Sequence, residues 1–373
     1  MKSGWVTKKL GEVCESISTR GCQIQQNEIC DIGKFPVVSQ SEAFIEGYTD
    51  FENTIKNVPV VLFGDHTCCV KYVDFPFVVG ADGTKLLTAK QFEVKFLYYA
   101  ILKISFSLVD GKYRRHFKDL KKCDIPIPPL PEQKRIVAKI DAAFEKIDAL
   151  KANAEKNLAN AKELFQSALD EAMRPKKGWD EKRLGEVCAI TSVMVDPTLP
   201  QFTNMLHVGG GNIVSDTGEL IDLKSAKEEK LKSGKYTFNK SMVLYNKIRP
   251  YLKKVARPHF SGLCSADMYP LLPNDSITRD FLYYILLTSQ FTTYAIGESE
   301  RAGMPKVNRE ELFAYRVKIP GTQDEQNAIA EKMDGVRKSL KTLQQNYARQ
   351  IADCAEMRQA ILREAFEGRI STN

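Results

Sequence analysis

The stretch that decides the fold is GWVTKKLGEVC at residues 4–14, because it returns with few changes as GWDEKRLGEVC at residues 178–188. The two stretches contain both tryptophans of the chain, Trp5 and Trp179. Self-similarity at a long period indicates that one structural unit occurs twice. The sequence therefore predicts a pseudo-two-fold repeat of two related halves, about 1–175 and 178–373.

Two further pairs of matching segments support the repeat. FLYY at 96–99 returns at 281–284, and each copy continues as an apolar run. The segment IPIPPLPEQKRIVAKID at 125–141 has a weaker copy, KIPGTQDEQNAIAEKMD, at 318–334. Both copies lead into long stretches without proline, in residue types that favour helices. Each half therefore ends in a predicted long helix.

Composition and charge narrow the class of protein. The chain has 373 residues, with 54 Lys and Arg against 47 Asp and Glu, and a formal net charge of +7. A composition with 43% hydrophobic and 27% charged residues excludes a disordered chain, a collagen-like chain and a small disulfide scaffold. No apolar run approaches the roughly 18–20 residues of a membrane span, and the first residues contain no apolar signal segment. We therefore expect a cytoplasmic protein without membrane contact.

The cysteines and histidines show no pattern of a metal site or a disulfide framework. The nine cysteines are scattered without a CxxC pair, and Cys68 and Cys69 are adjacent. The four histidines are isolated from one another. This pattern favours reduced cysteines and predicts no zinc site. The basic balance permits a polyanionic partner but does not establish one.

The pattern of short apolar runs divides each half into a globular domain and a helical region. Runs bounded by Gly, Asp, Pro and Asn are typical of strands. They predict mixed α/β (α+β) domains at 1–125 and 177–318. The regions 126–176 and 319–373 are predicted to form long helices. Inside the globular domains the two halves share no obvious pattern between their anchors, so we expect one scaffold with two sets of loops.

The stretches 131–173 and 323–369 carry apolar residues at alternating steps of three and four, which predicts one apolar stripe on a charged helix. The stripes include Ile136, Ile140, Phe144, Ile147, Leu150 and Leu158 in the first helix and Met333, Val336, Leu340, Leu343, Tyr347 and Ile351 in the second. At about 1.5 Å per residue, each helix would span roughly 60–70 Å. An antiparallel coiled coil would cover both stripes. Two alternatives are independent helices that fold back on their own domains, and a coiled-coil adaptor that binds a partner without DNA function.

With these motifs, and the ending QAILREAFEGRI at 359–370, the chain resembles the specificity subunit of type I restriction-modification systems over essentially its whole length. The resemblance implies two target-recognition domains in tandem, joined by two long antiparallel helices. Each domain would read one half of a bipartite target in double-stranded DNA. The helices would fix the separation of the half-sites and dock methyltransferase subunits. The chain departs from the family pattern where Gly321 and Thr322 replace a Pro-Pro pair.

The same resemblance implies partners and cofactors. The chain would be a non-catalytic subunit that binds two copies of a methyltransferase subunit and, in the full complex, restriction and motor subunits. It would hold no cofactor itself. S-adenosylmethionine, ATP and Mg would belong to the partner subunits.

Basic clusters mark the places where DNA would be contacted. No acidic residue occurs between Glu229 and Asp267, whereas nine residues of that window are basic. Such clusters neutralise phosphates, and an Arg such as Arg249 or an Asn such as Asn246 can pair with guanine or adenine. Any single one of these residues could also be an ordinary solvated side chain. The residues predicted to contact DNA are His66, Thr67, Lys112, Tyr113, Arg114, Arg115, Tyr245, Asn246, Lys247, Arg249, Lys253, Lys254, Arg257, Arg301, Lys306 and Asn308.

A stand-alone metal-dependent nuclease is a further alternative. Asp82, Glu93 and Lys95 have a spacing that some nucleases use to hold a divalent ion, but the spacing is common by chance. The second half does not repeat it, because Thr278 and Asp280 occupy the last two places. The sequence has no GxxxxGK[ST] motif, and it lacks the glycine loop and Asn/Asp-Pro-Pro-aromatic motif of an amino-methyltransferase.

Overall fold

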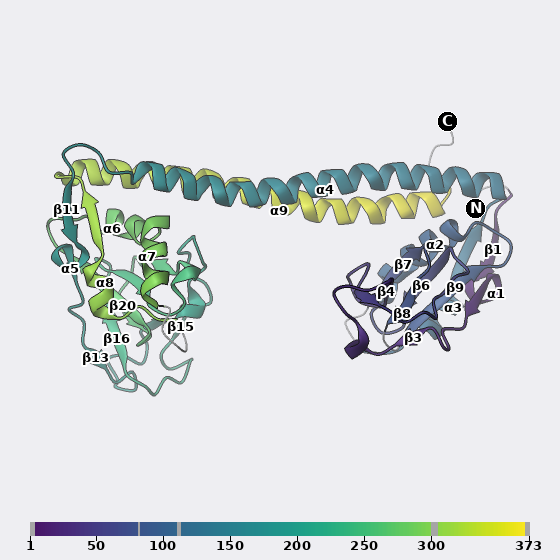
Figure 1. The fold of residues 1–373 in the computed structure, drawn as a ribbon, viewed down its shortest axis with the longest axis horizontal. Helices are drawn as coiled ribbons and strands as arrows, with labels where there is room; N and C mark the ends of the chain where they lie inside the picture. Colours follow the sequence, from purple (N-terminus) through teal and green to yellow (C-terminus); the bar gives the residue numbers. More distant parts are fainter. Residues whose placement is uncertain (1–3, 81–82, 110–112, 300–304, 370–373) are drawn as a thin grey trace. The chain divides into compact units, whose positions relative to one another are not determined.

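The computed structural model describes residues 4–80, 83–109, 113–299 and 305–369 (Figure 1). Contacts within the chain divide it into two compact units. Unit 1 comprises residues 1–155 and 347–373, and unit 2 comprises residues 156–346. Among the described residues, no helix is both long and apolar enough to cross a membrane.

Unit 1 combines small sheets with short helices. Its strands are β1 (Val6–Lys9), β2 (Cys14–Ile17), β3 (Gln23–Ile24), β4 (Phe35–Val38), β5 (Gly47–Thr49), β6 (Val60–Gly64), β7 (Val70–Val73), β8 (Val78–Gly80), β9 (Thr84–Ala89) and β10 (Asp124–Ile127). Its shorter helices are α1 (Leu10–Val13), η1 (Gln26–Glu28), α2 (Val94–Leu108) and α3 (Phe117–Lys122). In the part of unit 1 that the structure describes, the sheets have the orders β2-β9-β6-β7, β3-β8-β4-β5 and β1-β10. Strand β6 reads VVLFG and is buried at every position, so it lies at the centre of its domain.

Unit 2 repeats this design with different sequence. Its strands are β11 (Asp180–Arg183), β12 (Cys188–Ala189), β13 (Met194–Val195), β14 (Leu206–Val208), β15 (Lys224–Ser225), β16 (Lys235–Phe238), β17 (Val243–Asn246), β18 (Val255–Ala256), β19 (Gly262–Cys264), β20 (Met268–Pro273) and β21 (Arg316–Ile319). Its shorter helices are α5 (Leu184–Val187), η2 (Gly210–Asn212), η3 (Pro250–Leu252), α6 (Arg279–Ile285), α7 (Ser289–Ser299) and α8 (Arg309–Ala314). The sheets formed by its described residues have the orders β12-β20-β17-β18, β13-β16-β19-β14-β15 and β11-β21.

The repeat extends into the stretches where the two sequences share no pattern. The antiparallel order β2-β9-β6-β7 matches β12-β20-β17-β18 strand for strand. The parallel pair β4–β8 of unit 1 matches the parallel pair β14–β19 of unit 2. The predicted tandem of α+β units is confirmed. Many different sequences can provide the burial pattern that a strand needs. The two units can therefore share one strand order even where their sequences do not match.

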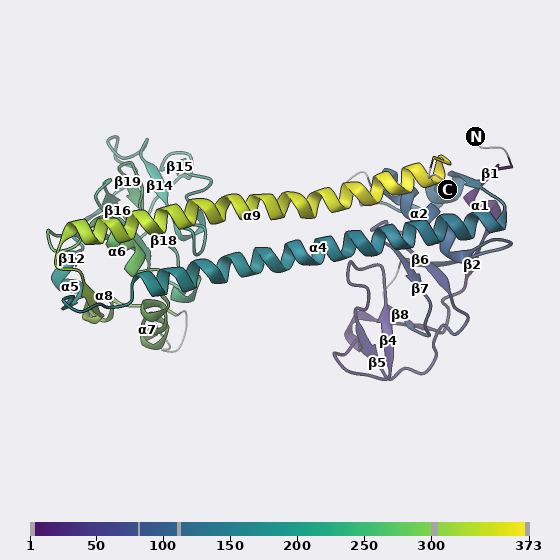
Figure 2. The same ribbon diagram turned by 90° about the horizontal axis from the view of Figure 1, so that it is seen from above.

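Two long helices complete the fold. Helix α4 (Leu130–Ala172) begins in unit 1 and ends in unit 2, and α9 (Gln323–Phe366) begins in unit 2 and ends in unit 1. Within each unit, the α4 and α9 segments lie side by side in both views (Figure 1 and Figure 2). Both predicted helices are therefore present. The predicted boundary between each recognition domain and its spacer stays a prediction, since the contacts group the start of α4 and the end of α9 with unit 1.

The stripe of α4 packs on its own globular domain and also on α9. In unit 1, Ile140 and Phe144 share one hydrophobic core with α2 and with Phe366 of α9, whose ring lies 5.0 Å from that of Phe96. In unit 2, Met333 of α9 shares a core with α6 and with Leu169 of α4. Folding back on the domain and pairing of the helices are thus not exclusive alternatives.

An equivalent cation–π pair between an arginine of α9 and a phenylalanine of α4 is present in each unit and defines the register of the helices. The guanidinium carbon of Arg358 in α9 lies 4.4 Å from the ring centroid of Phe144 in α4, and that of Arg337 in α9 lies 5.0 Å from Phe165 in α4. Phe165 follows Phe144 by the same number of residues as Arg358 follows Arg337. Both units therefore use one antiparallel register. Arg358 also pairs with Asp148 of α4 at 2.9 Å.

The predicted stripes are not covered along their full length. Ile136, Ile140, Phe144, Ile147, Met333 and Leu340 are buried, and Leu158, Val336, Tyr347 and Ile351 are partly buried. Leu150 and Leu343 remain 48% and 42% exposed. The expectation that the two stripes cover one another is wrong at these two positions. Each helix of a pair has sides that face away from the other helix, and only a third element could cover them.

The matched motifs hold the first turn of each long helix against its domain. Trp5 Nε1 donates to Glu132 of α4 at 3.1 Å, and Trp179 Nε1 donates to Glu325 of α9 at 3.1 Å. Nine residues further along each helix, or about two and a half turns, the hydroxyl of Tyr99 donates to Asp141, as that of Tyr284 does to Asp334. These contacts explain why Trp, Glu-Gln, the FLYY tyrosine and the final Asp of the signature recur together.

The buried glutamine of each signature bridges the helix and the domain. Gln326 is fully buried; its Oε1 accepts from the amide of Thr278 at 2.7 Å, and its Nε2 donates to the carbonyls of Ser276 and Pro320. Gln133 makes the equivalent bonds, accepting from the amide of Glu93 at 3.0 Å and donating to the carbonyl of Pro128.

Replacing Gln326 by Ala is expected to lower the free energy of unfolding by roughly 2–4 kcal/mol, because buried amide and carbonyl groups lose their partner. Urea denaturation followed by circular dichroism measures the change. Gln345→Ala, at an exposed position of the same helix, is the matched control and should change stability by less than about 0.5 kcal/mol. Equal losses in the two variants would contradict this role of Gln326.

Candidate nucleic-acid interface

Three loops of unit 1 meet beyond the end of strand β6, and we call them the first loop cluster: residues 39–46, 65–69 and 113–116. Thr67 Oγ1 donates to the carbonyl of Gln40 at 2.9 Å, which ties the first loop to the second. The amide of His116 donates to the carbonyl of Asp65 at 2.8 Å, which ties the third loop to the second. The three loops therefore form one surface feature although they are far apart in sequence.

The turn after β6 explains why Gly64 and Asp65 occupy their positions. A Cβ on Gly64 would lie 2.2 Å from Thr67 Oγ1, so a larger residue does not fit there. Asp65 is 5% exposed, and its carboxylate accepts from the amide of Phe117, the first residue of α3, at 2.8 Å. This turn thus also supports helix α3.

His66 and Tyr113 form a stacked pair on this cluster. Their ring centroids lie 4.8 Å apart with an angle of 4° between the ring planes, and Tyr113 is 87% exposed. Arg115 is exposed beside them, and Thr67 is exposed at the turn. Arg114 pairs with Asp119 at 2.5 Å. Lys112, which was predicted to contact DNA, lies outside the described residues.

Unit 2 has an equivalent second loop cluster, which comprises residues 209–212, 247–254 and 305–308. The amide of Lys247 donates to the carbonyl of Asp267 at 3.0 Å, as that of Asp65 does to Gly83 at 2.8 Å. The amide of Val307 donates to the carbonyl of Lys247 at 3.1 Å, as that of His116 does to Asp65. The two clusters thus share main-chain hydrogen bonds, while their side chains differ.

The second cluster contains two residues with a strained backbone. Arg249 and Lys253 have φ angles of 52° and 46°, a left-handed conformation that costs a residue with a side chain about 1–3 kcal/mol. They flank the one-turn helix η3, and the amide of Arg249 donates to the carbonyl of Pro305 at 2.9 Å. Arg249 and Lys306 are exposed. Strain of this kind is typical of sites where the backbone must present particular side chains.

Several residues predicted to contact DNA have structural roles instead. Tyr245 is 1% exposed in the core of unit 2, and burial raises the pKa of its hydroxyl. Asn246 is 8% exposed and donates to the carbonyl of Ile248. Asn308 caps helix α8 by accepting from the amide of Glu311. Arg301 lies outside the described residues. We therefore leave Tyr245, Asn246 and Asn308 out of the proposed interface.

Arg257 joins the domain to helix α9 rather than facing outward. It pairs with Asp280 at 2.7 Å and with Asp334, and its guanidinium carbon lies 4.6 Å from the ring centroid of Tyr283. Burial lowers the pKa of this guanidinium, but the hydrogen bonds that it donates to both carboxylates outweigh burial and raise the pKa. The positive charge of Arg257 is thus balanced by carboxylates within unit 2.

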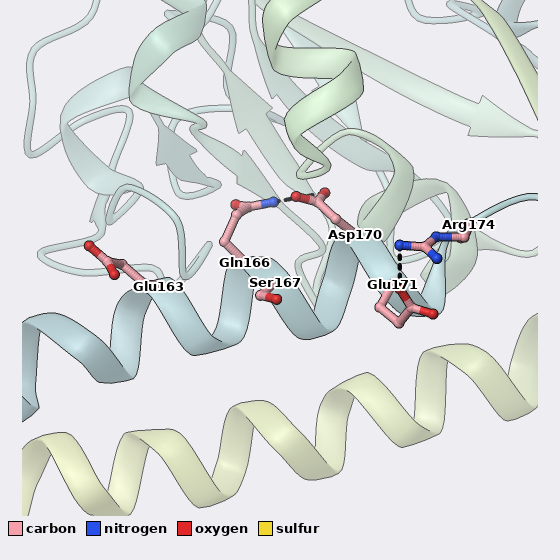
Figure 3. Close-up of a pocket in the computed structure, with 6 residues that line it drawn as sticks. All are labelled: Glu163, Gln166, Ser167, Asp170, Glu171 and Arg174. Carbon is pink, nitrogen blue, oxygen red and sulfur yellow. Dashed lines mark hydrogen bonds and ion pairs between the residues drawn. The ribbon is translucent and has the colours of Figure 1, made fainter.

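Lys253 and Lys247 are also engaged within unit 2. Lys253 Nζ donates to Gln166 of α4 at 2.6 Å. Lys247 Nζ donates to the carbonyl of Ala266 at 2.7 Å, and burial lowers the pKa of its amine. Gln166 belongs to a hollow of about 470 Å³ that also contains Glu163, Asp170 and Glu171 (Figure 3). Its carboxylates would repel phosphates, so this hollow is not part of the candidate interface.

The spacing proposed for a nuclease has structural partners where it is described. Lys95 pairs with Asp141 of α4 at 2.7 Å, and Glu93 precedes α2 with its amide bonded to Gln133. Asp82 lies outside the described residues. Among those that are described, no group of three or more His, Cys, Asp or Glu side chains could hold a metal ion.

Sequence reasoning missed the loops at 39–46 and 209–212. They lie in the stretches that do not match between the halves, and the first contains no basic residue. The run Gly209–Gly211 was the one sequence signal for the second loop, because consecutive glycines indicate that the backbone comes close to another group.

A model of the family described as type I restriction modification DNA specificity domain matches this chain twice, at residues 2–160 and 176–351. Among curated proteins, the specificity subunit of the type I restriction enzyme EcoDI of Escherichia coli is 26% identical over 287 residues, which cover 68% of this chain and 64% of that protein. The EcoR124I/EcoR124II specificity subunit of Escherichia coli is 23% identical over 355 residues, or 89% of this chain and 87% of that protein. This chain thus spans a little under two thirds of the first relative.

Solved structures with a similar fold include the HsdS subunit from Thermoanaerobacter tengcongensis, with a TM-score of 0.54, 20% identity and coverage of 99% and 98% of the two chains. A chain from a structural study of complex assembly and conformational transition in the type I R-M system matches with a TM-score of 0.74, 20% identity and coverage of 99% of both chains. At this identity the similarity shows the fold, including its tandem units and long helix pair.

The structure separates two arginines that the sequence treated alike. Arg249→Ala is expected to weaken binding to a DNA duplex and to reduce the slope of log affinity against log salt by about 1, because a phosphate contact is lost. Arg257→Ala is expected to leave that slope unchanged and to lower the free energy of unfolding by about 2 kcal/mol. Fluorescence anisotropy at several salt concentrations and urea denaturation measure the two quantities. Identical behaviour of the two variants would contradict this distinction.

Proposed function

The chain belongs to the family of type I restriction-modification DNA specificity domains, and on this premise we propose that it is a non-catalytic specificity subunit for double-stranded DNA. Each unit reads one half of a bipartite target through its loop cluster. The observation that carries this proposal is the pair of clusters, which share main-chain bonds and differ in their side chains. A protein that reads two different half-sites with one scaffold needs this combination.

The exposed chemistry of the clusters supports contact with DNA. Arg115, Arg249 and Lys306 are exposed cations that can neutralise phosphates. The Tyr113 ring, stacked on His66, offers a flat face, and Tyr251 is 51% exposed in the second cluster. Phosphate contacts set the position of the protein, and the side chains at the loop tips read the bases.

We further propose that the helix pair docks two methyltransferase subunits. Leu150 and Leu343 are exposed, and they occupy equivalent positions in the two halves when Glu132 is aligned with Glu325. Under the same alignment Leu164 is equivalent to Met357, and both are exposed, at 61% and 45%. Exposed large apolar residues that recur under the pseudo-symmetry suit two copies of one partner.

The remaining parts of the complex follow from the same proposal. Restriction and motor subunits join the methyltransferase–specificity complex. S-adenosylmethionine, ATP and Mg belong to these partners, and this chain holds none of them. The length of the paired helices fixes the number of bases between the half-sites. Among the described residues, no contact favours the nuclease alternative, because Lys95 is already paired with Asp141. The match to the DNA specificity family supports our proposal over the adaptor alternative.

The proposal is tested by mapping methylated adenines in cells that express this chain with its methyltransferase partner. We expect one bipartite motif. Exchanging residues 15–120 for those of a relative should change one half-site and leave the other, because one loop cluster is replaced. Methylation without a defined motif, or a change in both half-sites, would contradict the proposal.

The double variant Leu150→Asp and Leu343→Asp is expected to lose both methyltransferase copies, and each single variant is expected to lose one. Burying a carboxylate in an apolar interface is unfavourable, which is the reason for the loss. Sedimentation velocity or native mass spectrometry measures the stoichiometry. Ala152→Asp and Gln345→Asp, which are exposed at equivalent positions two residues further along, are the matched controls. Two bound copies in the double variant would exclude this docking surface.

A further inference from the structure

The loops at 39–46 and 209–212 have no role assigned by the sequence, yet each belongs to a loop cluster. The first follows strand β4 and the second follows strand β14, which are equivalent strands with equivalent parallel partners. Gln40 accepts a hydrogen bond from Thr67 in the turn after β6, and Gly210 lies against the side chain of Asn246, the last residue of β17. The first loop therefore stands next to a residue predicted to contact DNA, and the second stands next to the start of the segment 247–254 of its cluster.

In unit 1, a buried lysine holds the loop at 39–46 in place through hydrogen bonds. Lys71 of β7 is 4% exposed, and its Nζ donates to the carbonyls of Ser39, at 2.8 Å, and Ala43. Burial lowers the pKa of this amine, which shows that its environment is unfavourable for charge. A lysine is rarely buried unless its charge is bonded, so both carbonyls are tightly constrained.

The tip of this loop is exposed to solvent. Glu42, Ala43, Phe44 and Ile45 are exposed, with Phe44 at 47% and Ile45 at 37%. A carboxylate can accept from the amino group of cytosine, and apolar side chains can contact the methyl group of thymine. Because the loop carries no positive charge of its own, its chemistry suits base edges better than phosphates.

Unit 2 has the same connection built from a different residue. Lys254, which directly precedes β18, donates from Nζ to the carbonyl of Gly210 at 2.5 Å. A Cβ on Gly210 would lie 3.1 Å from Asn246 Nδ2, whereas one on Gly211 would meet open space. The glycine next to the lysine is thus packed closely, and the following glycine presents its backbone outward.

The two lysines come from equivalent hairpins of the two domains. Lys71 lies on the second strand of the hairpin β6–β7, and Lys254 lies at the start of the second strand of the hairpin β17–β18. Counted from the paired strands, they are not at the same position, because Lys71 faces Leu62 whereas the carbonyl of Lys254 accepts a hydrogen bond from the amide of Asn246. The two halves differ in sequence, yet in each of them a lysine of the hairpin binds a main-chain carbonyl of the loop, from a different position of the hairpin. This indicates that both halves require a fixed loop.

We propose that residues 39–46 and 209–212 are base-reading elements of the two half-sites, and that Lys71 and Lys254 are the positioning residues that hold them. This inference rests on the proposed function and adds residues to it. It also changes the role of Lys254 from a phosphate contact to an internal support. The two roles differ in their effect on the salt dependence of binding.

The test uses the assembled methyltransferase complex with Lys71→Met or Lys254→Met. Loss of the support releases the loop, so Lys71→Met should reduce discrimination between bases at least 10-fold in one half-site, and Lys254→Met should do so in the other. The second half-site of each variant should keep its bases. The slope of log affinity against log salt should not change. Methylated-adenine mapping and anisotropy at several salt concentrations give the two readouts.

Matched controls separate position from charge. Lys8→Met and Lys182→Met remove one lysine from the equivalent strands β1 and β11 and should leave both half-sites unchanged. Lys254→Arg keeps a donor and should retain most of the discrimination. The double variant Phe44→Ser and Ile45→Ser keeps the Lys71 support intact, so it tests the first loop even if Lys71→Met fails to fold. It should relax the same half-site.

The outcomes distinguish this inference from the function on which it rests. A wild-type complex without a bipartite motif would overturn the proposed function. A wild-type complex with such a motif, together with Lys254→Met that keeps all base preferences and lowers the salt slope by about 1, would return Lys254 to a phosphate contact and overturn the inference. Unchanged bases in Phe44→Ser and Ile45→Ser would overturn it for the first loop.

Discussion

The hydrogen bonds of two buried glutamines are the constraint on which the rest of the structure depends. Gln133 and Gln326 lie in the first turns of the long helices, and each ties its helix to the domain that precedes it. A buried amide that binds main-chain groups on both sides fixes direction as well as distance. Because each helix leaves its own domain at this fixed point, the end of each helix can reach the core of the other unit.

The sequence predicted the parts of the fold whose side chains make these contacts. Trp5, Glu132, Tyr99 and Asp141 recur as Trp179, Glu325, Tyr284 and Asp334, and the structure shows that each set makes two equivalent side-chain hydrogen bonds between a domain and its long helix. Such bonds leave a visible pattern in the sequence because both side chains of each pair are needed. The long helices were predicted for a similar reason, since one buried face requires a regular period.

The candidate site was predictable only in part, because charge in a sequence does not reveal direction. Arg249 and Arg257 belong to one basic window, yet Arg249 is exposed whereas Arg257 lies between two carboxylates. Tyr245 was predicted to contact DNA, but it is buried in a strand, whereas Tyr251 of the one-turn helix η3 is exposed. In the same way, the helical period predicted that Leu150 belongs to a buried stripe. It could not show that the surrounding segments leave this side chain exposed. These distinctions depend on contacts between segments that are remote in sequence.

The loop clusters went largely unseen for a physical reason that also bears on how such a protein changes. The connecting bonds that the two clusters share use main-chain atoms only: the carbonyls of Asp65 and Lys247 accept, and the amides of His116 and Val307 donate. Nearly every residue type can supply a main-chain carbonyl or amide, so these bonds place little restriction on the side chains of the loops. Substitutions at the tips can therefore alter the surface presented to a partner while the bonds that position the loops persist. Divergent loops and a stable scaffold are then two consequences of the same main-chain bonding.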